Sequence, residues 1–249
     1  MKRSAVTVFL MLLSVCAAFG QGPKTIKAPE TPKSEATAAD RSAIERAQAT
    51  QMAHGGDKLK NLRSLVMRGS VDITTSAMNQ AIPSTFVTVI AGDKYNYEIN
   101  NPFQPLKQVY DGTQTFSSLR GFSLPPITSL GFPLLTKIGV AGYVITSLSD
   151  AKKKRSGFRI TTPEGYYTDF LTDEKTSQVK GYESSYDYDG RTITTSVVVD
   201  KCLLVDGVLV PERYSQRFDL GQLTAYADFK SKVILVNSTI DNDVFAMPK

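Results

Sequence analysis

Apolar and polar residues alternate with period two near the end of this chain. Between residues 223 and 235 six apolar side chains share one parity, and these are Leu223, Ala225, Ala227, Phe229, Val233 and Leu235. The residues between them are mostly polar or charged, so an extended strand here has one apolar face and one solvated face. The preceding run repeats the pattern with Val208, Val210, Tyr214 and Phe218. Such neighbouring runs predict an antiparallel meander.

Shorter alternating runs predict further strands at about residues 65–74, 84–91, 94–100, 108–110, 113–119, 158–162, 166–171 and 178–186. Hairpin dipeptides separate some of the runs, namely Asp111-Gly112, Asp189-Gly190 and Asp206-Gly207. A strand over residues 223–236 would be roughly 45 Å long at about 3.4 Å per residue, so the sheet has to curl strongly. The predicted fold class is mainly β with a few helices, in which a curved antiparallel sheet forms an unclosed half-barrel.

A helix is predicted ahead of the first strand. Asp40 is suited to cap this helix, and Gly55-Gly56 is suited to end it after His54, because aspartate accepts backbone N–H groups at helix starts and glycine adopts the conformation that ends helices. One side of the helix carries Ile44, Ala47, Gln51 and Met52.

Residues 121–149 break the strand rhythm. The segment has many large apolar side chains, one lysine and no acidic residue. Proline interrupts its first half, whereas residues 134–148 could form one apolar helix despite two glycines. Two interpretations stay equally open, a core helix that fills the curled sheet and a lid over a cavity. A third is a patch that docks another protein.

The first residues have the layout of an export signal. Lys2 and Arg3 precede an apolar run at residues 5–15, and small residues follow up to Gly20. This run is shorter than the roughly 20 residues that a spanning helix needs. We predict a cleaved signal at residues 1–20, a flexible leader at 21–38 and one domain at 39–249, with the mature protein soluble in the periplasm. Lipidation of Cys16 is the alternative, which Val15 beside it disfavours.

The composition leaves little chemistry for catalysis. His54 is the only histidine, and Cys202 is the only cysteine that stays if Cys16 leaves with the signal. An ordinary zinc site needs more such ligands, and any histidine-dependent triad would have to use His54. We therefore predict no metal, no cofactor and no enzymatic activity. A formal charge of +5 is too small to indicate nucleic acid as a partner.

Two charged clusters carry alternative hypotheses. Glu183, Asp187 and Asp189 lie among tyrosines, so a hydrolase is conceivable, although the chain has no tryptophan to stack a sugar and Asp189 fits a hairpin turn. A basic run follows the apolar segment and consists of Lys152, Lys153, Lys154 and Arg155. Such a run is commonly a solvated loop, and its sharper interpretation is contact with lipid headgroups or a membrane surface.

Several short stretches together resemble the outer-membrane lipoprotein-sorting family (LolA-like/LolB-like). They are MAHGGDKLKNLRSL at 52–65, KYNYE at 94–98, YDG at 110–112, GVLVP at 207–211 and VNSTIDNDVF at 236–245. The resemblance implies an unclosed antiparallel barrel around helices that plug or cover an apolar cavity, in a carrier of lipoprotein or lipid acyl chains. Characterised carriers hold the lid shut with an arginine from an early strand. Here no arginine occurs between Ile73 and Leu119, and Lys94 is the nearest cation.

Pattern and resemblance together favour a non-catalytic periplasmic carrier or binding protein whose partners are lipid or lipoprotein acyl chains. Burial of apolar surface would supply the affinity. The expected lining of the cavity and lid is Phe86, Ile90, Phe116, Phe122, Leu124, Ile127, Phe132, Leu135, Ile138 and Tyr143. The alternative is an envelope scaffold or sensor that binds another protein through residues 121–149.

Overall fold

The computed structural model describes residues 38–76, 78–103, 105–118, 127–148, 155–188, 191–219 and 224–247. The predicted export signal and, apart from Ala38, the predicted leader lie outside these residues. The chain divides into two units, Met1–Glu35 and Ala36–Lys249, and every described element belongs to the second. No helix among the described residues is both long and apolar enough to cross a membrane.

The secondary structure is mainly β. The helices are α1 (Ala38–Ala53), α2 (Asp57–Lys60) and the 3-10 helices η1 (Ile127–Ser129), η2 (Phe132–Lys137) and η4 (Asn242–Phe245). The strands are β1 (Ser64–Thr75), β2 (Met78–Ala91), β3 (Lys94–Asn100), β4 (Leu106–Tyr110), β5 (Thr115–Ser117), β6 (Val144–Thr146), β7 (Gly157–Thr161), β8 (Tyr167–Thr172), β9 (Val179–Tyr188), β10 (Arg191–Val205), β11 (Val208–Asp219) and β12 (Thr224–Val236). The runs predicted from alternation all contain strands.

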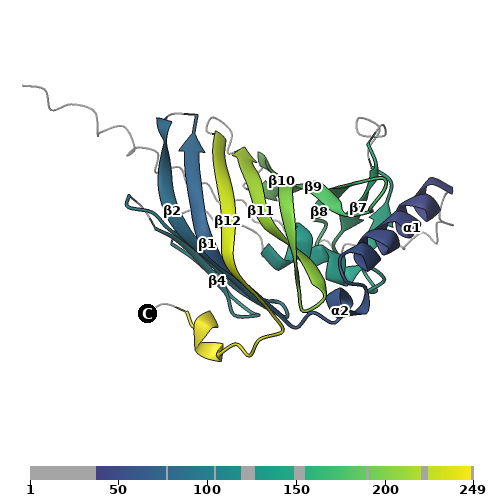
Figure 1. Cartoon of the computed structure of the whole chain (residues 1–249), viewed down its shortest axis with the longest axis horizontal. Coiled ribbons are helices and arrows are strands. Elements are labelled where there is room, and N and C mark those ends of the chain that lie inside the picture. Colours follow the sequence, from purple (N-terminus) through teal and green to yellow (C-terminus); the bar gives the residue numbers. More distant parts are fainter. Residues whose placement is uncertain are drawn as a thin grey trace, which may run out of the picture. The chain divides into compact units, whose positions relative to one another are not determined.

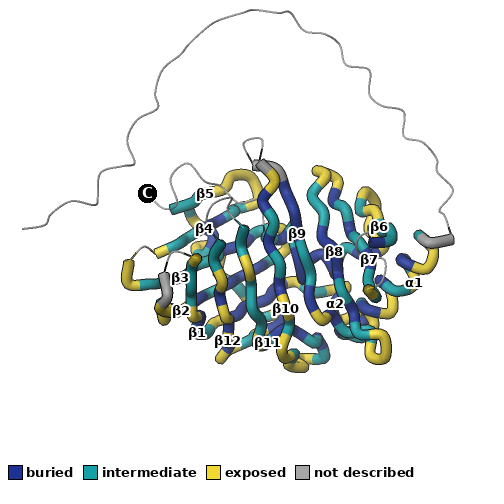
Figure 2. Tube along the Cα trace, turned by 90° about the horizontal axis from the view of Figure 1, so that it is seen from above, coloured by how far each residue is buried: buried dark blue, intermediate teal, exposed yellow. Residues whose placement is uncertain are grey.

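All strands belong to one 12-stranded sheet in the order β5-β4-β3-β2-β1-β12-β11-β10-β9-β8-β7-β6. Every pairing in it is antiparallel, and the sheet curves across its width (Figures 1 and 2). β5 and β6 stand at opposite edges and do not pair with each other, so the barrel is not closed. The predicted unclosed half-barrel is therefore confirmed.

The strand order explains why a long apolar segment connects β5 to β6. From β1 the chain runs outward to β5 at one edge, and from β6 at the other edge it returns inward to β12 beside β1. The connection between the edges contains η1 and η2, so it has to pass from one side of the open barrel to the other. Its η2 part contributes fully or nearly fully buried side chains to the core, namely Phe132, Leu134, Leu135 and Ile138.

The predicted apolar helix over residues 134–148 is wrong. The chain forms η2 instead, then turns through Gly139 and Gly142 and enters β6. Both glycines have positive φ, at 83° and 88°, a backbone conformation that is incompatible with continuing a right-handed helix. Of residues 132–138, Phe132, Leu134, Leu135 and Ile138 are buried in the core, whereas residues 121–126 and 149 lie outside the described residues.

The predicted helix before the first strand is present as α1. Of the side named from the sequence, Ala47 is buried, Ile44 and Gln51 are half-buried, and Met52 is 71% exposed. The buried residues at helical spacing are Ala43, Ala47, Thr50 and His54. α1 packs against β6, β7 and η2 at one end of the sheet (Figure 1). Small side chains on the buried side let the helix approach the sheet closely, which hydrophobicity alone does not indicate.

The alternation predicted for β12 is confirmed in its first half and wrong in its second. Ala227 and Phe229 are buried, but Val233 and Leu235 are each 44% exposed. The register against β1 shifts between the pairs Gly69–Ser231 and Arg68–Val233, so β12 carries one extra residue there. Such a β-bulge moves all later side chains to the other face. Ile234 and Val236 consequently take the core positions.

The sheet has two packed faces. The larger core cluster lies on the face that meets α1, α2 and η2, which we call the inner face. The outer face carries a smaller cluster that includes Val66, Val89, Val109 and Phe245, the last of which belongs to η4. The inner face thus collects apolar side chains from almost every strand, and any ligand site inside the curl has to be built from them.

Replacing Gly69 by alanine should lower the free energy of unfolding by at least about 2 kcal/mol, since overpacking against backbone is poorly relieved. A Cβ at Gly69 would lie 2.0 Å from the carbonyl oxygen of Lys230. Gly165→Ala is the control, because a Cβ there meets no atom within 4 Å although φ is +89°, and it should cost about 1 kcal/mol. Urea unfolding measures both, and equal losses would contradict a packing requirement at the bulge.

Candidate functional site

The inner face is lined by aromatic rings in contact with one another. Phe86 meets Phe229 edge to face with ring centroids 5.0 Å apart, and Phe229 stacks on Tyr214 at 4.7 Å. A second series lies toward the β7 edge, where Phe158 stacks on Phe170 at 5.2 Å and Phe170 lies 5.8 Å from Tyr182. These two series cover much of the inner face with apolar, rigid surface.

Three tyrosine side chains pack against the same inner-face core, namely Tyr97 on β3, Tyr182 on β9 and Tyr214 on β11. Five strands separate β3 from β9 in the sheet order. In a flat sheet these two strands would be about 29 Å apart at about 4.8 Å per strand. The curl of the sheet therefore turns the three side chains toward a common interior.

Burial raises the pKa of all three hydroxyls. Tyr182 also accepts a hydrogen bond from the backbone N–H of Phe132, which opposes that rise in its pKa. Within the described part of the chain, the hydroxyls of Tyr97 and Tyr214 make no hydrogen bond. All three side chains are half-buried.

A cleft of about 230 Å³ opens between the start of β1, the end of β2 and η2. Its apolar lining consists of Leu62, Leu65, Ile90, Phe132, Pro133 and Val140. Three cations also line it, Lys60, Arg63 and Lys137, and the last of these pairs with Asp93 at 3.3 Å. Apolar walls with basic residues among them suit an amphiphile that carries an anionic group.

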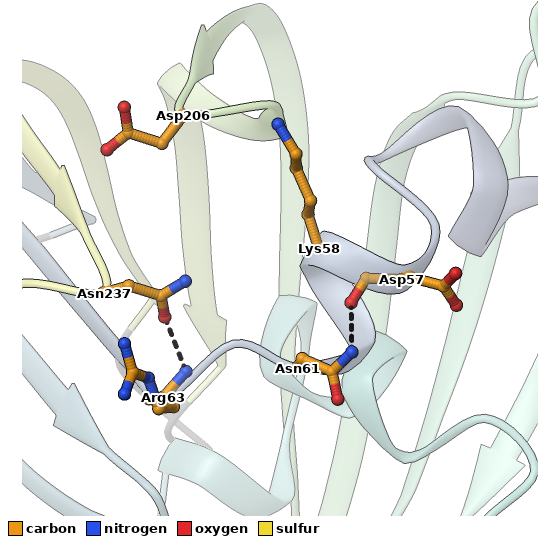
Figure 3. A pocket seen from close by; sticks show the side chains of 6 residues that line it. All are labelled: Asp57, Lys58, Asn61, Arg63, Asp206 and Asn237. Carbon is orange, nitrogen blue, oxygen red and sulfur yellow. Dashed lines mark hydrogen bonds between the residues drawn. The ribbon is translucent and has the colours of Figure 1, made fainter.

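A second pocket, of about 420 Å³, is polar (Figure 3). It lies where the sheet forks, because β11 and β12 pair only from Arg213 to Asp219 and from Thr224 to Lys230. Its lining consists of Asp57, Lys58, Asn61, Arg63, Asp206 and Asn237. The side-chain oxygen of Asn237 accepts from the backbone N–H of Arg63 at 2.8 Å (Figure 3). Its lining side chains are all charged or amide groups, with charges of both signs, so it does not suit an acyl chain.

The structure brings most of the residues predicted to bind ligand into one cluster. Phe86, Ile90, Phe132, Leu135 and Ile138 are buried members of the inner-face core. Ile127 and Tyr143 are half-buried and pack against it. Phe116 does not join them, because its partner Val109 points to the outer face, where Phe116 packs in the smaller cluster. Phe122 and Leu124 lie outside the described residues.

Of the four residues predicted to contact lipid headgroups, the structure describes one, Arg155. Arg155 is exposed just before β7, whereas Lys152, Lys153 and Lys154 lie outside the described residues. The basic residues that line the apolar cleft were not singled out from the sequence. They come from separate elements, Lys60 from α2 and Lys137 from η2, and no local run of charge marks them.

The three interior tyrosines were also missed as a group. Tyr214 lies on the predicted apolar parity of its strand, and Tyr97 shares its parity with Tyr95 and Ile99, so parity alone could place Tyr97 inside as well. Tyr182 shares its parity with Gln178, Lys180 and Ser184, and the register of β9 against β8 shifts near Val179, so parity does not place it. Which of these side chains meet depends on the curl of the sheet, which alternation does not specify.

His54 holds elements together rather than facing a pocket. Its side chain is fully buried, and its Nδ1 donates to the carbonyl of Leu209 at 2.6 Å. Its Nε2 accepts from the backbone N–H of Val179 at 3.0 Å, and its ring meets Phe132 edge to face at 5.5 Å. Burial lowers the pKa of His54, against a smaller opposing effect of the hydrogen bond to Leu209. The neutral imidazole thus joins the end of α1 to β9, β11 and η2.

Other candidate reactive groups are not assembled into a site. Burial raises the pKa of the Cys202 thiol to about 11, which keeps it protonated near neutral pH. Glu183 lies next to the Arg159–Asp169 ion pair, on the face of β9 opposite to Tyr182. Asp189 lies outside the described residues. In the part of the chain that the structure describes, no three metal-ligating side chains of histidine, cysteine, aspartate or glutamate come together.

No family model matches this sequence, and no curated protein matches it. Among solved structures, the chain is similar to a DUF1329 family protein from Desulfovibrio piger, with 10% identity and a TM-score of 0.49 over 84% of this chain and 98% of that chain. It is similar to a LolA superfamily protein from Nitrosomonas europaea, with 10% identity and a TM-score of 0.48 over 85% and 99% of the two chains. It is also similar to a candidate outer membrane lipoprotein-sorting protein domain from Vibrio parahaemolyticus, with 10% identity and a TM-score of 0.48 over 83% of this chain and 97% of that chain. Proteins of the family that the sequence resembles are thus among the structures similar to this chain.

Acid should destabilise the protein through His54. The folded-state pKa of His54 is lowered from 6.5, so between the two pKa values the unfolded chain binds a proton that the folded chain does not. This contribution to stability is complete above about pH 6.5 and is lost progressively as the pH falls below it. Urea unfolding of the wild type and of His54→Gln from pH 8 to 5 measures it. The variant should lose less stability over this range, and parallel curves would contradict a buried neutral histidine.

Proposed function

We propose that this protein is an exported, non-catalytic carrier or binding protein for lipid or lipoprotein acyl chains, which it holds at the inner face of the curled sheet. One observation carries the proposal: an apolar cleft of about 230 Å³ lies between β1, β2 and η2. Three of its lining residues, Leu65, Ile90 and Phe132, are buried members of the inner-face core.

Apolar transfer accounts for binding without further chemistry. Each buried CH₂ contributes about 0.8 kcal/mol, so a chain of ordinary lipid length gains enough to bind even after its ordering cost. The effect is non-directional, so chains of similar girth bind alike. Lys60, Arg63 and Lys137 line the apolar cleft and would attract an anionic headgroup, with Arg155 and its preceding lysines as a second basic candidate.

The scaffold alternative has less support from the described residues. It requires the apolar connection to present its side chains to another protein. Phe132, Leu134, Leu135 and Ile138 instead lie in the core, and Val140 and Val144 are the exposed large apolar residues of residues 127–148. Two separate side chains make a small docking surface.

Co-purified lipid tests the proposal directly. Native mass spectrometry of the protein purified from membranes should find bound lipid, and the delipidated protein should take up a fluorescent fatty acid. Both results follow from an apolar interior that is filled by ligand in the cell. A protein that is consistently empty and takes up no probe would overturn the proposal.

Val199→Trp should reduce uptake of the probe at least about fivefold, because the larger side chain occupies space inside the sheet. Val199 is half-buried against the inner core and pairs with Tyr214. Val198→Trp is the matched control, since Val198 is the neighbouring residue and is 59% exposed. Fluorescence titration measures uptake and thermal unfolding checks the fold. Equal uptake by the two variants would place the ligand elsewhere.

A further inference from the structure

The geometry points to a ligand that occupies both pockets at once, an amphiphile with a zwitterionic phosphodiester head. Its acyl chain lies in the apolar cleft, its phosphate at Arg63 and its ammonium group in the polar pocket at Asp206. Arg63 is the one described residue that lines both the cleft of about 230 Å³ and the polar pocket of about 420 Å³. This inference rests on the proposed function, because it names the class of lipid that the cleft would hold.

One short segment separates the two pockets. Residues 57–65 run from α2 into β1. The residues of this segment that line only the polar pocket are Asp57, Lys58 and Asn61, and those that line only the cleft are Lys60, Leu62, Ser64 and Leu65. The two pockets therefore lie along the same stretch of chain, and a ligand that extends from one into the other has to pass Arg63.

Hydrogen bonds fix the backbone of Arg63 and leave its guanidinium group available. The backbone N–H of Arg63 donates to the side-chain oxygen of Asn237 at 2.8 Å (Figure 3), and its carbonyl accepts from the N–H of Gly92 at 3.1 Å. Within the described residues, the guanidinium group makes no hydrogen bond and no ion pair. A planar guanidinium group suits two oxygens of one phosphate. Arg63 is thus placed to bind a phosphate where the two pockets meet.

The charges of the polar pocket match a zwitterion. Two cations line it, Lys58 and Arg63, and two carboxylates, Asp57 and Asp206. All four residues are exposed, and none of their side chains forms an ion pair with another described residue. A plain anion here would meet two carboxylates, and a plain cation would meet two positive groups. A phosphate with an ammonium group beside it offers each sign an opposite charge.

The apolar cleft on its own offers only positive charge. Its charged lining residues are Lys60, Arg63 and Lys137, and Lys137 pairs with Asp93, which does not line the cleft. An ammonium group therefore meets no carboxylate in the lining of the cleft and meets one in the polar pocket. The order of acyl chain, phosphate and ammonium group along such a lipid is the order of apolar cleft, Arg63 and Asp206 across the protein.

Displacement of a fluorescent acyl probe compares ligands that share one chain and differ in the head. The probe is cis-parinaric acid methyl ester, and the competitors are oleoyl lysophosphatidylethanolamine, oleoyl lysophosphatidylglycerol and monoolein. The wild type should bind the ethanolamine lipid about twofold to fivefold more tightly than the glycerol lipid, since an exposed ion pair adds a modest free energy. The glycerol lipid should exceed monoolein by a similar factor. Glycerophosphoethanolamine, which has the head and no chain, should not displace the probe.

Asp206→Asn should abolish the preference for the ethanolamine lipid over the glycerol lipid. The fold should tolerate this change, because Asp206 has a φ of +49° in a hairpin turn, a conformation that asparagine adopts readily. Asp200→Asn is the matched control, since Asp200 is an exposed aspartate of β10 that lines neither pocket, and it should keep the preference of the wild type. Arg63→Met retains an apolar stem and should weaken both phospholipids about twofold to fivefold while leaving monoolein unchanged.

Equal binding of the two phospholipids by the wild type, or a preference that survives in Asp206→Asn, would overturn the inference and leave acyl binding intact. Displacement of the probe by glycerophosphoethanolamine, or undiminished binding of both phospholipids by Arg63→Met, would do the same. If none of the three lipids displaced the probe from the wild type, the proposed function would fail, and the inference with it.

Discussion

The open edges of the sheet constrain the rest of this structure. β5 and β6 do not pair, so the chain between them has to cross the mouth of the half-barrel. A segment that crosses the interior has to be apolar, and here it supplies Phe132, Leu134 and Leu135 to the core. Because backbone hydrogen bonds do not close the barrel, side-chain contacts across the interior have to hold its curvature. His54 contributes to this by tying α1 to β9, β11 and η2.

The same architecture explains why space suited to a ligand can exist beside a well-packed core. At η2 the interior is filled by fully buried aliphatic side chains. Beside η2, the cleft of about 230 Å³ has apolar walls and three cations in its lining. Apolar walls provide affinity without direction, whereas a charged side chain acts on one polar group of a ligand.

The charged side chains that the structure describes do not lie among the stacked aromatic rings of the inner face. The basic residues that line the cleft come from α2, the segment before β1 and η2, so they approach one another only in the folded chain. The ion pair of Arg159 and Asp169 lies on the other face of the sheet from Phe158 and Phe170. Separating charges from the aromatic interior keeps that interior neutral, which favours apolar and uncharged polar ligands.

Period-two alternation by itself determined the strands, the turns and the open curved sheet, because the side-chain period of a strand is local and written directly in the residues. Tertiary structure decided the rest. The extra residue in β12 exposes Val233 and Leu235, the small residues of α1 rather than Met52 face the core, and Phe116 packs on the outer face. Which inner-face side chains meet across the interior depends on how far the sheet curls, since strands as distant as β3 and β9 are separated by five others. Curvature arises from the summed packing of both faces, which no short stretch of sequence contains.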